Sequence, residues 1–322
     1  MVKQLLLLLP LAACGKFQDP AIVLDLRPIA MIADSPEQVV DVDLNNPPSA
    51  DQVLAQLHDA NVSMVLSDLN FDRGIRWHAE LCNLTDAERC DHGNPYVDLG
   101  SGLWDDPDVT PPPPIHVAAD GNLLGVVFDE VQNDALHGLG GVYYGVSVKF
   151  GGDGADPALD QYAAKTLAIQ PNIPAPRAPN TNPTIDHIDA QIGGKDADKV
   201  TLPLGSCDGA APTLLAVPVA TKIHLTPVEL DTTRETYSVP TVDGMSRTFT
   251  EAVTYQWLAA GGKFSDGTTG GGHDPFGNLS PLDTDYTTPD AKDVTGPVQL
   301  WIIVRDERLG VSVYEACLQV GS

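Results

Sequence analysis

Aspartate side chains are the residues whose spacing could support chemistry in this chain. Three groups lie in loop-like sequence: Asp105, Asp106 and Asp108; Asp153, Asp156 and Asp160; and Asp283, Asp285 and Asp290, near Asp274. Calcium takes about six to eight oxygen ligands, which loops between strands readily supply. Asp283 and Asp285 are our candidate metal ligands, because Thr284 and Tyr286 can add nearby carbonyl oxygens. No group has the EF-hand spacing, so solvated loop charge is the alternative.

Paired carboxylates also act as general acid and base in hydrolases, which is the enzymatic alternative for this chain. Other catalytic signatures are absent from the sequence: there is no Gly-x-Ser-x-Gly, no His-Glu-x-x-His and no phosphate-binding loop, and none of the 8 histidines lies four residues from another. We therefore expect a protein without enzymatic activity and without a resident cofactor, calcium being the one ion to consider.

Aromatic side chains in long loops are the second kind of candidate site. Loops are expected around 103–108 and 261–275, and they bring Trp104 and Phe276 forward as stacking platforms. Loops at the ends of a sandwich commonly carry binding sites. A module that binds a glycan or protein with the help of calcium is therefore the alternative reading of function for this chain.

The N-terminal segment has the layout of a secretory signal. Lys3 precedes an apolar run from Leu5 to Leu11, followed by Ala12 and Ala13. The run is too short for a bilayer, which needs about 20 residues. The sequence Leu-Ala-Ala-Cys14 resembles the lipobox of bacterial lipoproteins.

That resemblance implies removal of residues 1–13, acylation of Cys14 and attachment to a membrane. Gly15 stands where some bacteria place an aspartate for inner-membrane retention, which favours the outer membrane. An ordinary cleaved signal, with Cys14 spare or paired, is the alternative.

The other cysteines are Cys82, Cys90, Cys207 and Cys317. An even number in an exported chain indicates disulfides, and four cysteines allow three pairings. The near pair in the first half and the far pair in the second favour Cys82 with Cys90 and Cys207 with Cys317. No Cys-x-x-Cys or neighbouring histidine pair suggests zinc.

The composition argues against anionic partners. Asp and Glu number 44 against 18 Lys and Arg, a formal net charge of −26. Nucleic acid and anionic lipid would be repelled by this charge. The 29 glycines and 27 prolines favour turns and short strands over long helices.

The first half reads as short strands with two helices. Strands are expected at 22–33, 38–44, 62–69, 74–82, 142–150 and 163–169, with 62–69 and 74–82 forming a hairpin and 91–114 a loop. Ser49 with Gln52 three residues later predicts a helix N-terminus. A second helix is expected over 122–136.

The second half follows a proline-rich stretch, 170–183, which predicts a semi-rigid extended linker. Strands are expected at 185–192, 200–204, 214–219, 222–230 and 252–258, and a hairpin joins 297–306 to 310–320. The glycine-rich stretch 261–272 reads as a loop. Short strands at this spacing are typical of an antiparallel sandwich.

Tyr255-Gln-Trp257 resembles the central strand of bacterial immunoglobulin-like and PKD-type domains, in which a tryptophan packs against the opposite sheet. The run 301–306 fits their closing hairpin, and Trp77 takes the matching position in the first half. With its lipobox, the chain resembles cell-surface lipoproteins of myxobacteria and their relatives.

The resemblance implies an all-β fold of two antiparallel immunoglobulin-like β-sandwich domains, the first with short helical insertions. The expected division is a signal peptide over 1–13, a tether over 14–21, a sandwich over 22–169, the linker over 170–183 and a sandwich over 184–322. The expected role is structural or binding work at the cell surface, through a membrane anchor on Cys14.

Overall fold

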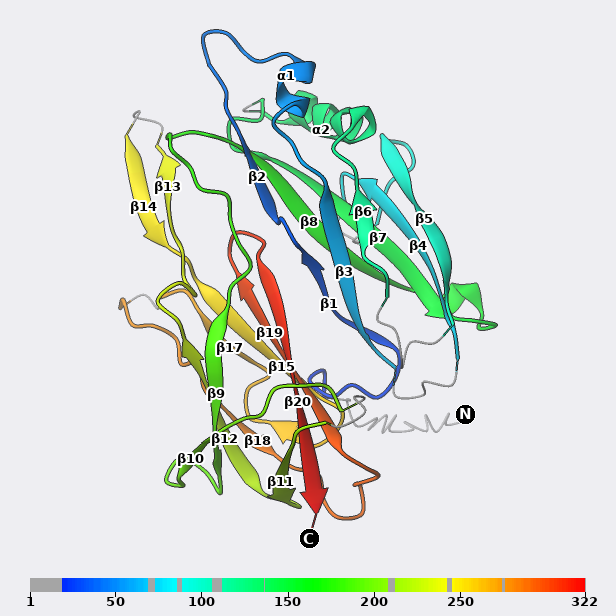
Figure 1. Ribbon diagram of the computed structural model, residues 1–322, viewed down its shortest axis with the longest axis vertical. Coiled ribbons are helices and arrows are strands. Elements are labelled where there is room, and N and C mark those ends of the chain that lie inside the picture. The colour runs from blue at the N-terminus through cyan, green and yellow to red at the C-terminus, as the bar shows by residue number, and fades with distance from the viewer. Residues whose placement is uncertain are drawn as a thin grey trace, which may run out of the picture.

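The computed structural model describes residues 19–68, 73–85, 89–105, 112–135, 137–207, 212–241, 245–273 and 276–321. These residues form two β-sandwiches, the N-terminal one in the upper part of Figure 1 and the C-terminal one below it. The expected signal peptide, Cys14, Asp106, Asp108 and Asp274 lie outside the described residues.

The N-terminal sandwich has one sheet of three strands and one of five. The first contains β1 (Arg27–Ala33), β3 (Ala60–Ser67) and β6 (Ile115–Val117), in the order β1-β3-β6. The second contains β2 (Glu37–Val40), β8 (Gln161–Pro171), β7 (Val142–Gly152), β4 (Ile75–Cys82) and β5 (Tyr96–Trp104), in the order β2-β8-β7-β4-β5. Every pair is antiparallel except β2 with β8.

The C-terminal sandwich has two sheets of five strands. One contains β10 (Lys199–Thr201), β9 (Ile185–Ile192), β12 (Lys222–Glu229), β18 (Thr284–Thr287) and β16 (Lys263–Phe264), in this order. The other contains β11 (Leu214–Pro218), β20 (Val311–Gly321), β19 (Val298–Asp306), β15 (Val253–Ala259) and β17 (Thr268–Gly271), in this order. A separate hairpin joins β13 (Thr236–Pro240) to β14 (Ser246–Thr250).

The two sandwiches repeat one strand order. Strands β1-β3-β6 correspond to β9-β12-β18, and β2-β8-β7-β4-β5 correspond to β11-β20-β19-β15-β17. In the N-terminal domain β2 crosses to the other sheet and pairs in parallel with the last strand, β8, and in the C-terminal domain β11 pairs in the same way with β20. This is the immunoglobulin arrangement, with strands A, B and E in one sheet and G, F and C in the other. The predicted pair of immunoglobulin-like sandwiches is confirmed, with one parallel edge pair in each.

The predicted tryptophan positions lie on equivalent strands but differ in burial. Trp257 on β15 is 0% exposed, and its Nε1 donates to Thr269 Oγ1 at 2.9 Å. Trp77 on β4 is half-buried and stacks on Trp104, with 5.6 Å between ring centroids. Tyr144 on β7 is 2% exposed and is one of the large side chains in the N-terminal core.

Three sequence expectations for the strands are wrong. The segments 62–69 and 74–82 do not form a hairpin, because β3 pairs with β1 and β6 while β4 pairs with β5 and β7 in the opposite sheet. The expected loop over 91–114 contains β5, an edge strand whose largely exposed residues lack an alternating apolar pattern. Likewise, the glycine-rich stretch contains β16 and β17.

Both expected helices form at the same end of the N-terminal sandwich (Figure 1). Helix α1 (Ala50–Leu54) begins after Ser49, whose side chain accepts from the Gln52 amide while the Gln52 side chain accepts from the Ser49 amide. Helix α2 (Gly121–Asn133) is capped by Asp120, and a 3-10 turn, η1, spans Pro157–Leu159. In the described part of the chain, no helix is long and apolar enough to cross a membrane.

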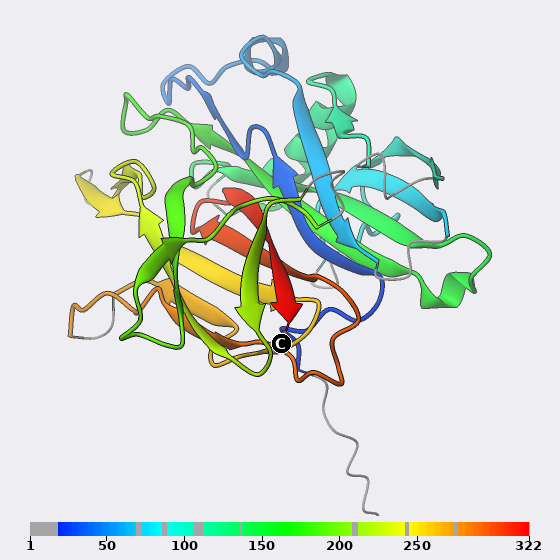
Figure 2. The same ribbon diagram turned by 60° about the horizontal axis from the view of Figure 1, so that its bottom comes forward.

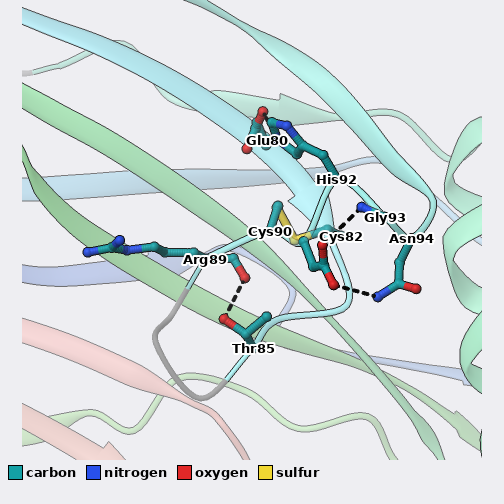
Figure 3. Close-up of a disulfide and its surroundings, with 9 residues drawn as sticks. Glu80, Cys82, Thr85, Arg89, Cys90, His92, Gly93 and Asn94 are labelled. Carbon is teal, nitrogen blue, oxygen red and sulfur yellow. Dashed lines mark hydrogen bonds and ion pairs between the residues drawn. A yellow bond between two sulfur atoms is a disulfide. The ribbon is translucent and has the colours of Figure 1, made fainter.

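The two predicted disulfides are confirmed. Cys82 pairs with Cys90 across 8 residues, and Cys207 pairs with Cys317 across 110. Figure 3 shows the first bond closing the connection from β4 towards β5, where Thr85 Oγ1 also donates to the Arg89 carbonyl at 3.0 Å. Structural disulfides are typical of proteins from oxidising compartments.

The expected linker is packed between the sandwiches instead of serving as a spacer. Asn180 is 3% exposed, and its Nδ2 donates to the Arg308 carbonyl at 2.8 Å. Asn182 Nδ2 donates to the Ala33 carbonyl, and its Oδ1 accepts from the Val311 amide, at 2.7 and 2.9 Å. The linker therefore bonds to both domains at once.

The expected tether also contributes to the fold. Ala21 is 6% exposed and packs in the C-terminal core, and the Val23 amide donates to the Ala259 carbonyl at 2.8 Å. The chain thus contacts the C-terminal sandwich before it enters β1. A small apolar cluster containing Ile29, Trp301 and Ile303 continues this contact between the domains.

Candidate binding site

An apolar pocket of about 410 Å³ opens at the helical end of the N-terminal sandwich. Its walls come from β2 and the segment after it, both helices, the 137–139 turn and the adjoining ends of β7 and β8. The lining residues are Val40, Val42, Asp43, Leu44, Pro47, Pro48, Val53, Val127, Phe128, Val131, His137, Gly138, Leu139, Val142, Ile169 and Pro171. The volume falls within the range of about 300–1,000 Å³ that is usual for small-molecule sites.

The pocket has a buried floor and an exposed apolar rim. Val127, Val142 and Ile169 are 4–6% exposed and belong to the domain core. At the rim, Leu44 is 61% exposed and Leu139 is 46% exposed. Large aliphatic side chains that remain open to water beside a cavity mark a surface that a ligand can cover.

Local sequence explains how the helical wall forms. Asp120 Oδ1 accepts from the Asn122 and Leu123 amides, so α2 begins at a fixed point. Leu123 and Val127, four residues apart, lie on one face of the helix and are buried against the sheets. Phe128 and Val131 are thereby brought to the pocket side.

The turn after α2 brings the chain back to the rim. Gly138 has φ of 83°, a left-handed conformation that glycine adopts without steric cost. A Cβ at this position would lie 3.3 Å from Val142 Cγ2. The turn leads directly to Leu139, which lines the pocket together with Leu44.

The chemistry of the pocket is that of an apolar binding site. Among its described lining residues, Asp43 and His137 alone have polar side chains, and both are exposed. An apolar ligand can therefore fill the floor while its polar group stays in water at the mouth. The sequence contained no motif for this site, because its walls come from five separate segments between residues 40 and 171.

The predicted metal pair lies in a cluster of ion pairs on the C-terminal sandwich. Asp283 Oδ2 accepts from Lys195 Nζ at 2.7 Å, a hydrogen bond that lowers the Asp283 pKa. Burial opposes ionisation of Asp285, but hydrogen bonds from His224, at 2.9 Å, and Lys222, at 3.1 Å, outweigh it and lower the Asp285 pKa.

The cations beside these carboxylates are therefore the chain's own side chains, and two lysine ammonium groups would repel a divalent ion. Across the described ranges, no three histidine, cysteine, aspartate or glutamate side chains lie close enough to hold a metal. In this structure Asp283 and Asp285 are the ion-pair partners of Lys195 and Lys222.

Among the other aspartates of the three predicted groups, those that the structure describes mostly stabilise turns or form ion pairs. Asp153 Oδ1 accepts from the Gly154 amide, and Asp156 caps η1 through the Ala158 amide. Asp160 forms ion pairs with Arg76 and Lys149. Asp105 follows β5, and Asp290 lies in an exposed turn of the C-terminal sandwich.

The two predicted stacking residues are not brought together. Trp104 is 7% exposed because one ring face lies against Trp77, so the protein itself occupies the expected platform. Phe276 is 88% exposed and lies on the other sandwich. They do not form a shared glycan site.

A second, polar cavity of about 230 Å³ lies between the domains. Glu37, Arg177, Tyr237, Glu307 and Arg308 are among the residues that line it. These groups bind one another: Glu37 accepts from both arginines, and the Tyr237 hydroxyl donates to Glu307 at 2.7 Å. Their hydrogen bonds hold the domain boundary together.

No protein-family model matches the chain, and no curated protein matches it. Solved structures with a weak likeness include a red sea bream transglutaminase, at 9% identity and a TM-score of 0.23, covering 93% of this chain and 32% of the transglutaminase. Murine CEACAM1b has 8% identity and a TM-score of 0.21, and the match covers 92% of this chain and 100% of the CEACAM1b chain.

The C-terminal domain of the Streptococcus agalactiae AgI/II polypeptide BspA also has 8% identity and a TM-score of 0.21, covering 90% and 99% of the two chains. This chain thus spans about a third of the transglutaminase. Similarity at these TM-scores says nothing about what the chain binds.

Proposed function

We propose that this chain is a non-enzymatic binding protein, anchored to the outer membrane by lipid on Cys14, and that its N-terminal sandwich binds an aliphatic chain. One observation carries the binding role: α1 and α2, the two helical insertions in the sandwich, both line one apolar cavity. The insertions thus supply walls that the sheets alone do not provide.

The lining indicates the class of ligand. Valine, leucine, isoleucine and proline side chains dominate the walls, and Phe128 supplies the one phenyl ring among the described lining residues. Burial of a methylene group stabilises a complex by about 0.8 kcal/mol, so an aliphatic chain gains affinity along its length. Asp43 and His137 lie where the ligand's polar group would meet water.

The anchoring part of the proposal is supported by the leader and the disulfides. The cation, the short apolar run and Leu-Ala-Ala-Cys14 have the order of a lipoprotein signal, and both disulfides fit an exported protein. Metabolic labelling with an alkyne analogue of palmitate tests it. We expect label on the full chain and none on Cys14→Ser; equal label on both would refute acylation at Cys14.

A fluorescence titration tests the pocket. The probe is 11-dansylaminoundecanoate, and the protein is the chain from Gly15, which retains every described residue. Val131→Trp would fill the pocket from the α2 side, whereas Val200→Trp adds the same ring at a 40% exposed position on β10.

We expect the probe to become brighter with the starting protein and with Val200→Trp, and its affinity to fall at least about tenfold with Val131→Trp, because the ring occupies volume that the ligand needs. Far-ultraviolet circular dichroism checks that both variants fold. Absence of binding, or equal binding by the two variants, would refute the aliphatic site.

A further inference from the structure

We propose that the outer edge of β14 is a docking edge, to which an extended segment of another protein adds as a new strand. Within the described residues, the hairpin of β13 and β14 belongs to neither sandwich sheet, and β14 pairs with β13 alone. All five residues of β14 are exposed. In Figure 1, β14 is the outermost strand of the hairpin, with β13 between it and the rest of the molecule.

The hydrogen-bond pattern shows which backbone groups face outward. The Glu251 amide donates to the Glu235 carbonyl, and the Thr241 amide donates to the Met245 carbonyl, both at 2.9 Å. Hydrogen-bonded pairs alternate along an antiparallel ladder, so Arg247 and Phe249 also belong to bonded pairs.

The intervening residues of β14, namely Ser246, Thr248 and Thr250, therefore direct their N–H and C=O groups away from β13. The Oγ atoms of Ser238 and Thr248 lie 3.2 Å apart, which agrees with the close side chains of a non-bonded pair. Such a row of alternating donors and acceptors is matched by another extended backbone.

The opposite edge of the hairpin is protected. Pro240 on β13 is opposite Ser246, at an outward-facing position, and it has no N–H to donate. Proline is a common protection for a strand edge, and β14 carries no proline. Docking is therefore expected along β14 only.

The charge and side chains of the hairpin indicate its partner. Residues 236–250 contain one acid and one base, in a chain with a formal net charge of −26. Arg247 and the 44% exposed Phe249 lie on one face of β14, and serine and threonine lie on the other. A partner strand with an acidic residue opposite Arg247 and an apolar residue opposite Phe249 fits this face. A second copy of this chain would bring a second large negative charge, so another protein is favoured.

The base of the hairpin is fixed to the domain boundary, which gives the edge a defined direction. The Tyr237 hydroxyl donates to Glu307 at 2.7 Å, and the guanidinium of Arg308 lies 5.0 Å from the Tyr237 ring centroid. The Glu235 amide also donates to Glu251 Oε2 at 3.0 Å. A pre-positioned strand loses less entropy when a partner binds.

The test uses a phage-displayed library of random peptides, selected on the chain from Gly15. Thr248→Pro removes one outward N–H without breaking the ladder to β13. Its matched control, Ser238→Pro, makes the same change at the register partner on the opposite edge. Thr250→Pro is a second edge variant, and hydrogen exchange at the Glu251 amide reports whether the hairpin survives each substitution.

We expect the selection to enrich extended peptides. Their affinity should fall about tenfold with Thr248→Pro or Thr250→Pro, because one or two backbone hydrogen bonds to the peptide are lost. Their affinity should stay unchanged with Ser238→Pro. Failure to enrich any peptide, or equal weakening by the control, would overturn the docking edge. Sedimentation that shows a dimer dissolved by Thr248→Pro would overturn the choice of partner in favour of a second copy. None of these outcomes depends on the apolar pocket.

Discussion

Arg308 of the C-terminal sandwich and Glu37 of the N-terminal sandwich form a buried ion pair across the domain boundary, with 3.0 Å between Nη2 and Oε1. Their side chains are 7% and 2% exposed. Glu37 also accepts from Arg177 of the linker at 3.1 Å. On its other side, Arg308 Nη1 lies 3.3 Å from Glu251 and 3.4 Å from Glu235. Both sandwiches and the linker therefore meet at one guanidinium group.

Replacing this guanidinium should destabilise the whole protein. Arg308→Met would leave the Glu37 and Glu251 carboxylates buried without their shared partner, and breaking a buried pair in this way costs about 3–5 kcal/mol. Lys195→Met is the matched control, because its partner Asp283 is partly exposed and Lys195 itself is 64% exposed. The free energy of unfolding of this control should fall by less than about 1 kcal/mol. Urea denaturation measures both, and similar losses would contradict a structural role for Arg308.

Glu251 should make stability fall as pH rises. Burial raises the pKa of Glu251 to about 7, and the nearby Asp306 carboxylate adds to the effect, from an ordinary value of 4.5. Between these values the native state holds a proton that the unfolded chain releases. The contribution of Glu251 is therefore most favourable below about pH 4.5, declines towards pH 7 and is constant above it.

The difference between the native protein and Glu251→Gln isolates this contribution from those of the other acids. We expect the stability of the native protein, measured relative to the variant by denaturation at several pH values, to decrease across the window from about 4.5 to 7. If the stability of the native protein relative to Glu251→Gln instead increased with pH, the ion pair with Arg308 would outweigh burial and hold Glu251 ionised.

The two disulfides should contribute unequally to the free energy of unfolding. On the loop-entropy model, closure of 110 residues by Cys207–Cys317 stabilises by nearly 5 kcal/mol, and closure of 8 residues by Cys82–Cys90 by about 2.5 kcal/mol. Double alanine variants of each pair, compared by denaturation, measure the two effects. A larger loss for the short loop would mean that local packing, rather than loop length, sets the contribution.

Local features of the fold could be predicted from the sequence. Ser49 and Gln52 form the predicted capping box, and the hairpin of β19 and β20 has the predicted strands. The spacing of the four cysteines gave both disulfides. These features depend on residues near in sequence or on chemistry with few alternatives.

Long-range features could not be predicted. Nothing within β3 or β4 shows that the chain crosses from one sheet to the other between them, because each strand has a similar apolar pattern. Edge strands such as β5 and β14 bury few side chains, so they lack the alternation that indicates a strand. The hydrogen bond between Lys195 and Asp283 joins residues 88 positions apart, so the sequence around Asp283 gave no sign of it.

The most direct test of the aliphatic pocket is a calorimetric series of saturated fatty acids of increasing length, measured on the chain from Gly15. If the chain lies in the pocket, each added methylene should strengthen binding by about fourfold until the pocket is full, after which affinity should level off. Val131→Trp should bring the plateau to a shorter ligand. Affinity that is independent of chain length, or a series that Val131→Trp leaves unchanged, would contradict the account.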